Sequence, residues 1–335
     1  MPSPPASAPP RLVLVGTGGT IAGRAADARD NVGYRVGELG VQELLSGVGG
    51  IDEAIRGQGL GIEAEQLAQL DSKDMDHACW LGLVQRLAHH LASPQVRGIV
   101  VTHGTDTLEE TAWLLQRVLA PGKPVVLTAA MRPASSLQAD GPQNLADALC
   151  VAACADAAGV LVVLAGQVLA AGEARKQHTR RLDAFDAGEA GALALVEEGR
   201  LRRLRDWPRG QALGAAVLPN DPARWPWVEI VTSHAGARAG AVDALVGAGL
   251  RGLVVAGTGN ATVHEALLPA LLRAERAGVA VRLVSRCAAG PVLAGPDHRW
   301  PVYASLSAAQ ARVELMLELI VQEMAGASGE AGPGA

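Results

Sequence analysis

The chain of 335 residues is long enough for two domains of ordinary size, each with a core of its own. Hydrophobic residues make up 49% of the sequence but aromatic residues only 3%, so aliphatic side chains must fill those cores. The formal net charge is -5 and no basic stripe occurs, which argues against nucleic acid or an anionic membrane as a partner and favours a small-molecule substrate.

The two ends of the chain differ in composition from the rest. Residues 1–10, MPSPPASAPP, lack the basic start and apolar run of a secretory signal, so we expect a disordered tail on a cytoplasmic protein. Residues 326–335 are rich in Gly and Ala and are expected to form a flexible tail. No run of about 18 uncharged apolar residues occurs between them, so no membrane span is expected.

Residues 11–205 alternate strand-length apolar runs with segments of helical period. This order is typical of an α/β domain with a mostly parallel sheet and helices on both faces, and we expect a flavodoxin-like N-terminal domain that carries the catalytic residues. In such a sheet the functional loops follow the carboxyl ends of the strands. The expected strands are RLVLVG from residue 11, RGIVVTHG from residue 97, PVVLTAA from residue 124 and GVLVVLAG from residue 159.

Further along the chain the pattern weakens and then resumes. A helix is expected from about residue 107, where Thr107 and Glu110 have the spacing of a capping box. After about residue 168 we expect a polar, Arg-rich meander, and the prolines and turn residues of 206–226 predict a linker. A second, smaller α/β domain is expected over residues 227–325, with strands in WVEIVTSH, GLVVAGTGN and VAVRLVS.

A glycine-rich turn, GTGGTIAG, follows the first expected strand. It is not a dinucleotide fingerprint, because the sixth position counted from Gly16 is Ile21, and no GxxxxGK[ST] phosphate loop occurs anywhere in the chain. The turn would instead offer backbone N–H donors and present Thr17 or Thr20 at the edge of the sheet. The alternative is that these hydroxyls only cap a turn.

A second threonine-bearing loop, THGTDTLEE, follows the next expected strand and places Thr105 beside Asp106. By itself Asp106 could be a helix cap. Helix capping does not require two loops with threonine hydroxyls and a carboxylate at the same edge of a sheet, however. Their combination indicates nucleophilic chemistry. A threonine hydroxyl needs a base or a desolvated amine to take its proton. The candidates are Tyr34 and Lys176, each of which could also be an ordinary surface residue of a polar stretch.

Five motifs occur in order along nearly the whole chain between the tails. They are TGGTIAG at 17–23, DSKDM at 71–75, THGTDTLEETA at 102–112, AMRPASSLQADGPQNL at 130–145 and GTGN at 257–260. In this combination the sequence resembles the bacterial-type L-asparaginase and asparaginase/glutaminase family. The resemblance implies hydrolysis of L-asparagine to L-aspartate and ammonia through an acyl-enzyme, with neither metal nor organic cofactor.

The resemblance also implies catalytic roles for five residues. Thr20 stands at the position of the family's nucleophile, and Tyr34 would assist it from a mobile lid loop. Thr105, Asp106 and Lys176 match a second catalytic cluster, in which the lysine exchanges a proton with the threonine. Backbone N–H groups of the two loops would form an oxyanion hole.

Substrate binding is implied for four positions, Ser72, Thr105, Asp106 and Asn260. Ser72 and Asp106 match residues that hold the α-carboxylate and the α-ammonium of the substrate, and Asn260 matches a contact made to the site of a neighbouring subunit in a dimer or tetramer. The sequence departs from several periplasmic members at Lys73, where they carry Gln or Glu. The carboxylate that the family takes from its second subunit has no clear counterpart, although Asp297 lies in about the right region.

Other conspicuous residues are expected to be structural. His103 would orient the loop behind Thr105, because the family's chemistry uses no histidine base, and Asp140 with Asn144 would hold the ADGPQN turn. Two alternatives for function stay open at this stage. One is an amidohydrolase that prefers glutamine or another small amide, and the other is a noncatalytic amino-acid-binding protein on the same sheet.

Overall fold

The computed structural model describes residues 9–296 and 298–329. Residues 1–8 and 330–335 of the expected tails, and Asp297, lie outside the described residues. The chain forms two compact units, the first built from residues up to Ala187 together with Gly191–Ala215, and the second from Gly188–Ala190 together with the residues from Ala216 onward. The division at residue 215 falls inside the segment 206–226 that was expected to be a linker.

The first unit is built on an eight-stranded sheet with the order β10-β9-β6-β5-β4-β3-β1-β2. The five strands β2, β1, β3, β4 and β5 run parallel, and this 2-1-3-4-5 order is the flavodoxin-like one. The expected mostly parallel, flavodoxin-like sheet is therefore confirmed. The parallel strands are β1 (Arg11–Gly18), β2 (Gly61–Leu70), β3 (Val96–Thr102), β4 (Pro124–Thr128) and β5 (Gly159–Leu164).

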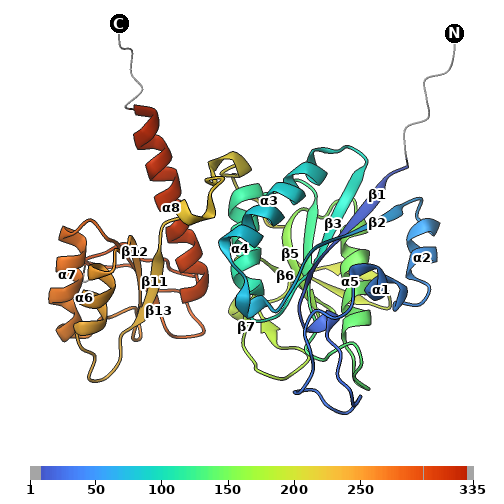
Figure 1. Cartoon of the computed structure of the whole chain (residues 1–335), viewed down its shortest axis with the longest axis horizontal. Coiled ribbons are helices and arrows are strands. Elements are labelled where there is room, and N and C mark those ends of the chain that lie inside the picture. The colour runs from blue at the N-terminus through green and yellow to red at the C-terminus, as the bar shows by residue number, and fades with distance from the viewer. Residues whose placement is uncertain (1–8, 297, 330–335) are drawn as a thin grey trace, which may run out of the picture. The chain divides into compact units, whose positions relative to one another are not determined.

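Helices cover both faces of this sheet. In Figure 1, α3 and α4 lie on one face and α1, α2 and α5 on the other. They bury apolar stripes because their aliphatic residues recur at helical spacing, as in α4, where Leu108, Leu115 and Val118 are fully buried. The helices are α1 (Val41–Ser46), α2 (Ile51–Gly57), α3 (His77–Ala92), α4 (Leu108–Leu119) and α5 (Gly141–Ala153).

Two local predictions for this unit were wrong. Thr107 does precede α4, but its side chain makes no capping bond and instead donates to the carbonyl of Ser72 at 2.8 Å, so there is no capping box. The polar, Arg-rich segment after residue 168 was expected to lack regular secondary structure. It instead extends the sheet with antiparallel strands and adds a small hairpin. These strands are β6 (Gln167–Ala170), β7 (Arg175–Lys176), β8 (Phe185–Asp186), β9 (Ala194–Glu197) and β10 (Arg200–Arg203).

The second unit is a smaller α/β layer with three parallel strands in the order β11-β12-β13. Within this unit α8 packs against all three strands, whereas α6 and α7 pack against each other on the opposite face (Figure 1). α8 extends to Gly329, so the helix continues into the segment expected as a tail. The elements are β11 (Val228–Thr232), α6 (Gly240–Gly247), β12 (Gly252–Gly257), α7 (Leu268–Arg276), β13 (Ala280–Ser285) and α8 (Ala308–Gly329).

Short 3₁₀ turns connect several elements and carry two of the expected site residues. They are η1 (Thr20–Ala22), η2 (Ser72–Asp74), η3 (Gly188–Ala190), η4 (Ala215–Val217), η5 (Pro222–Arg224) and η6 (Glu265–Leu267). Within residues 9–296 and 298–329, no helix has both the length and the hydropathy needed to cross a membrane.

Candidate active site

The loops that follow β1 and β3 meet at the carboxyl edge of the sheet. Gly19, with φ of 84°, packs directly on the second loop, since a Cβ atom on it would lie 2.5 Å from the backbone nitrogen of Gly104. A Cβ on Gly104 would in turn overlap the hydroxyl of Ser72, which follows β2. Glycine is therefore required where the three loops converge, because any larger residue would push them apart. Thr20 begins η1 directly after Gly19.

Thr20 is paired with Tyr34. The two hydroxyl oxygens lie 2.8 Å apart, and either can be the donor. Tyr34 is brought there by a lid of residues 24–35, whose ends are joined by reciprocal backbone hydrogen bonds between Arg24 and Arg35, both 2.9 Å. The Thr20 hydroxyl thus has a neighbour with which it can exchange a proton.

The lid rests on the segment that follows β4. Asn31 accepts a hydrogen bond from the hydroxyl of Ser136 at 2.6 Å, and the backbone N–H of Leu137 donates to the carbonyl of Ala28 at 3.0 Å. The backbone N–H of Ala25 donates to the Ser135 hydroxyl at 2.8 Å. These contacts hold the lid over Thr20 in this structure.

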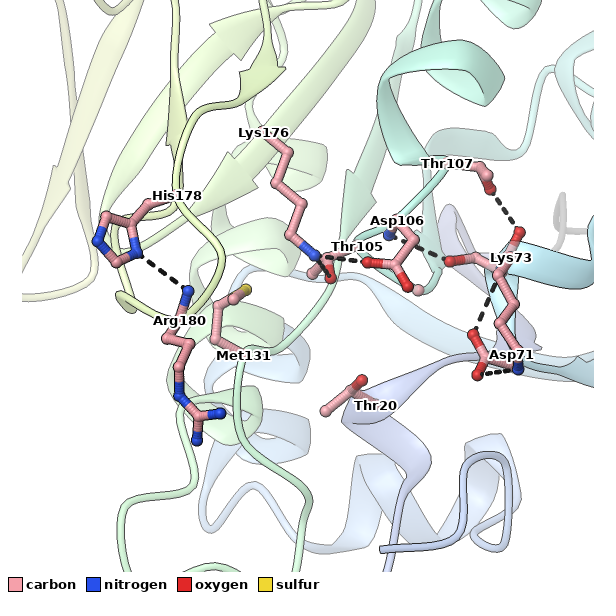
Figure 2. A network of polar contacts seen from close by, with 12 residues as sticks. Thr20, Asp71, Lys73, Thr105, Asp106, Thr107, Met131, Lys176, His178 and Arg180 are labelled. Atoms are coloured by element: carbon pink, nitrogen blue, oxygen red, sulfur yellow. Dashed lines mark hydrogen bonds and ion pairs between the residues drawn. The ribbon is translucent and has the colours of Figure 1, made fainter. Parts of the chain in front are cut away.

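Lys176 joins Thr105 and Asp106 into a second cluster (Figure 2). Its ammonium donates to the Thr105 hydroxyl at 2.8 Å and to the Asp106 carboxylate at 2.6 Å. Its backbone N–H donates to the carboxylate of Glu109 at 3.0 Å, which fixes the short strand β7 against the start of α4. Lysine, threonine and aspartate from distant parts of the sequence are thereby held in mutual contact.

Ser72 and its neighbours border this cluster. Ser72 is 1% exposed, and its side-chain oxygen accepts a hydrogen bond from the backbone N–H of Asp106 at 3.2 Å. Lys73 points its ammonium at Asp71, 2.5 Å away, and at Asp74, 3.2 Å away. The hydrogen bond with Asp71, and after it that with Asp74, raises the pKa of Lys73. The Lys73 ammonium is therefore paired with two carboxylates.

Both clusters line one pocket of about 230 Å³. Thr20 and Tyr34 face it together with Thr105, Asp106 and Lys176, so the structure brings all five expected catalytic residues to one cavity. The pocket also has lining residues that sequence reasoning did not single out. These are Asn31, Val32, Asp71, Ala130, Met131, Arg132, Thr179 and Arg180. Ser72 lies behind this lining rather than in it.

Family models match both parts of the chain. The model described as "Asparaginase, N-terminal" matches residues 11–209, and the one described as "Glutaminase/Asparaginase C-terminal domain" matches residues 227–324. The chain belongs to the asparaginase family. This confirms the family that the five sequence motifs indicate.

Individual members of the asparaginase family are similar over most of their length. L-asparaginase 2 of Escherichia coli is 34% identical over 92% of this chain and 89% of its own. Glutaminase-asparaginase of Pseudomonas fluorescens is 33% identical over 92% of this chain and 86% of its own. The crystal structure of a probable cytoplasmic L-asparaginase from Campylobacter jejuni has a TM-score of 0.85 at 32% identity, covering 93% of this chain and 98% of that one.

His103 supports the second loop of this asparaginase-family site from inside the domain. Its Nδ1 lies 2.7 Å from the Gly104 carbonyl, which can only accept, so Nδ1 carries the proton. Its Nε2, 3.1 Å from the hydroxyl of Thr111, then accepts from that hydroxyl, which itself accepts from the indole N–H of Trp80. Complete burial lowers the pKa of His103 to about 4. A neutral imidazole with both nitrogens occupied holds the loop and does not face substrate.

Asp140 and Asn144 hold the turn before α5. The Asp140 carboxylate accepts from the backbone N–H groups of Met131 and Arg132, both at 2.9 Å. Asn144 donates to the carbonyl of Ala129 at 2.9 Å and to Asp140 at 3.2 Å. The two side chains thus fix the segment from which Met131 and Arg132 reach the pocket.

Asn260 lies in the second unit, in the loop after β12. Its side-chain amide donates to the Leu293 carbonyl at 2.9 Å and accepts from the Leu293 N–H at 2.8 Å. Asp297, the residue considered as a carboxylate for a neighbouring site, is outside the described residues. In the part of the chain that the structure describes, no group of three or more His, Cys, Asp or Glu side chains is arranged to hold a metal ion.

Proposed function

We propose that this chain is an L-asparaginase, which hydrolyses the side-chain amide of L-asparagine to L-aspartate and ammonia. One observation carries the proposal: the Thr20 and Tyr34 pair and the Lys176, Thr105 and Asp106 cluster line the same pocket. Membership of the asparaginase family and the names of its similar members support the same reaction.

In the first step the Thr20 oxygen attacks the amide carbon of asparagine. Tyr34, 2.8 Å away, takes the hydroxyl proton and passes it to the departing nitrogen, which leaves as ammonia. The negative charge that develops on the carbonyl oxygen would be met by backbone N–H groups of the two loops, an interaction typically worth about 3 kcal/mol in the transition state. The product of this step is an ester between Thr20 and the aspartyl group.

In the second step water hydrolyses that ester. The amine of Lys176 can exchange a proton with the Thr105 hydroxyl, to which it is bonded at 2.8 Å, and so activate the water. Asp106 holds the lysine at 2.6 Å and keeps it directed at Thr105. Water gives its oxygen to the aspartyl group and a proton to Thr20, which restores the enzyme.

The substrate's charged end would be bound near Asp106 and Ser72. A carboxylate is the group that an α-ammonium needs when it leaves water, and Asp106 offers one in the pocket. Ser72 lies directly behind this carboxylate. Its oxygen accepts from the N–H of Asp106, and its own hydroxyl proton, which has no acceptor among the described residues, can be donated to the α-carboxylate of a substrate that reaches past the pocket lining.

We further propose that the enzyme is a cytoplasmic dimer or tetramer in which Asn260 approaches the site of a neighbouring subunit. The Campylobacter jejuni protein, described as a probable cytoplasmic L-asparaginase, supports the compartment. Sedimentation of the purified protein tests the assembly, and an active monomer would contradict it.

Ammonia release from separate L-asparagine and L-glutamine substrates tests the reaction, with Thr20→Ala as the paired variant. We expect wild type to release ammonia from asparagine and the folded variant to lose nearly all of that activity. The glutamine alternative stays relevant, because the Pseudomonas fluorescens relative is a glutaminase-asparaginase and one methylene is worth only about 1–3 kcal/mol in a pocket. Ligand binding without turnover, unaffected by Thr20→Ala, would instead indicate an amino-acid-binding protein.

A further inference from the structure

One wall of the pocket carries two arginines that the proposed reaction does not use. Arg180 lines the pocket, and its guanidinium has no hydrogen-bond or ion-pair partner among the described residues. The next residue, Arg181, is different, because its guanidinium is paired with Asp183 and it is not part of the pocket lining. The pocket is therefore lined by Arg180, whose guanidinium is unpaired, whereas the guanidinium of the adjacent Arg181 is already paired with a carboxylate.

Arg132 is the second arginine of this wall. Its guanidinium donates to the carbonyl of Met131 at 3.1 Å and to the carbonyl of Arg180 at 2.9 Å, so it holds the backbone that carries Arg180. Its Nε is buried and has no partner within residues 9–296 and 298–329. The wall thus presents two positive charges that form no ion pair with a carboxylate of the described residues.

Arg180, to whose carbonyl Arg132 donates, lies on the opposite side of Thr20 from the acidic residues. Figure 2 shows Arg180 and Met131 to one side of Thr20, and Asp106 and Asp71 to the other. An asparagine molecule bound with its α-ammonium at Asp106 and its amide carbon at Thr20 leaves the side with the arginines to the group that departs. Ammonia is too small and carries no negative charge, so it gives these arginines nothing to bind.

We propose that the pocket also accepts amides whose departing amine carries a carboxylate, that is, β-aspartyl dipeptides, with this carboxylate bound by Arg180 and the edge of Arg132. The aspartyl part would occupy the place of asparagine, so the proposal rests on the proposed function. Arg–carboxylate pairing supplies both charge and a matched pair of donors, which is why a guanidinium suits this position.

The reaction follows the same steps as asparagine hydrolysis. Thr20 forms an ester with the β-carbonyl carbon while the isopeptide C–N bond breaks, and the proton released by Thr20 passes through Tyr34 to the departing amine. The amino acid leaves with its carboxylate still held by Arg180. Water then cleaves the ester, so one dipeptide and one water yield aspartate and one free amino acid.

The experiment compares two substrates that differ only in the charge of the departing group. β-L-aspartylglycine has a carboxylate on the departing amine, and β-L-aspartylglycinamide has a neutral amide there. Chromatography of the released glycine or glycinamide gives kcat/KM for each, and ammonia release from asparagine is measured in parallel. We expect wild type to prefer β-aspartylglycine by about tenfold or more, which is the scale of a hydrogen bond to a charged group. Thr20→Ala should lose both activities.

Three substitutions connect that preference to the arginine wall. Arg180→Gln should reduce the ratio of the two kcat/KM values to about one, and Arg180→Lys should retain part of it because the charge remains. Arg181→Gln is the matched control and should keep the wild-type ratio, since its charge is already paired with Asp183. A ratio measured within one protein preparation does not depend on how much of a variant is folded.

The outcomes separate this proposal from the proposed function. Hydrolysis of asparagine without cleavage of β-aspartylglycine would overturn the inference and leave the asparaginase proposal intact. A wild-type ratio near one, or an Arg180→Gln ratio equal to that of wild type, would overturn it as well. Cleavage of β-aspartylglycine without hydrolysis of asparagine would support the proposed binding of the carboxylate by Arg180 and Arg132, and it would contradict the asparaginase proposal. Turnover of neither substrate would overturn both proposals.

Discussion

The hydroxyl oxygens of Thr20 and Tyr34 lie 2.8 Å apart, although one residue starts a 3₁₀ turn at the edge of the sheet and the other ends a lid loop. A threonine hydroxyl is a weak nucleophile until its proton is removed, so a proton must move from Thr20 to its neighbour if Thr20 is to attack a carbonyl. In the proposed mechanism the lid would therefore supply a proton acceptor as well as a cover for the pocket.

Removing the Tyr34 hydroxyl tests that role. Tyr34→Phe keeps the aromatic ring and its packing, so we expect an unchanged thermal midpoint and a fall in kcat of about 100-fold or more, the scale of a lost general acid or base. Ammonia release and a thermal unfolding curve on the same preparation check both parts. A variant that retains most of the wild-type kcat would exclude Tyr34 from proton transfer.

The Lys176 and Thr105 pair gives a second prediction. Each of Lys176→Met and Thr105→Val breaks the 2.8 Å hydrogen bond, and we expect each to lower kcat by about 100-fold or more. Because the proposed mechanism uses the two groups as one proton-transfer unit, the double variant should be no slower than the worse single variant. Independent effects that multiply in the double variant would contradict a shared proton-transfer step.

The buried strands could be predicted from sequence, whereas the edge strands could not. β4 and β5 are buried at every position, so both are continuous apolar runs, which is the signature of parallel strands covered on both faces. β2 pairs with a neighbour on one side only and carries Glu63, Glu65 and Gln66 among residues that are no more than partly buried. The alternation of apolar and polar residues in β2 is too weak to predict a strand, and β10 could not be predicted for the same reason.

The site shows the same division between local and long-range information. The motifs carry the residue types, but the contact of Lys176 with Thr105 spans 71 positions and that of Thr107 with Ser72 spans 35, so only the folded sheet brings them together. Arg180 could not be distinguished from Arg181 within the stretch RKQHTRR. Its significance depends on the Asp183 side chain, which pairs with one arginine and leaves the other facing the pocket.

The contact of the lid with the segment after β4 gives a third prediction. Asn31→Ala removes the acceptor of the Ser136 hydroxyl, a hydrogen bond worth about 1 kcal/mol, and should shift the lid toward open forms by about fivefold. We expect kcat/KM for asparagine to fall by a similar factor, with faster hydrogen exchange confined to residues 24–35. When Ser136→Ala is added to Asn31→Ala, the further loss of stability should be no more than that of the hydrogen bond from the Gln138 N–H to the Ser136 hydroxyl. Unchanged exchange in the lid would show that this contact does not hold it.

The burial of His103 predicts how stability depends on pH. Its pKa in the folded protein is about 4, below the ordinary value of about 6.5 in the unfolded chain, so between these values the unfolded chain binds a proton that the folded protein excludes. This difference in the pKa of His103 contributes about 3 kcal/mol to the free energy of unfolding. The contribution is complete above about pH 6.5 and is lost progressively as the pH falls toward 4.

Urea unfolding of wild type and His103→Gln at several pH values between 7 and 4.5 isolates this term. A glutamine side chain does not titrate, and the carboxylates common to both proteins contribute equally, so the difference between the two free energies reports His103 alone. We expect the variant to be less stable at pH 7, because the contacts with Thr111 and Gly104 are altered, and the gap to narrow steadily toward pH 4.5. Parallel curves would mean that His103 takes up a proton as readily in the folded protein as in the unfolded chain, which would contradict a buried imidazole that accepts a hydrogen bond from Thr111.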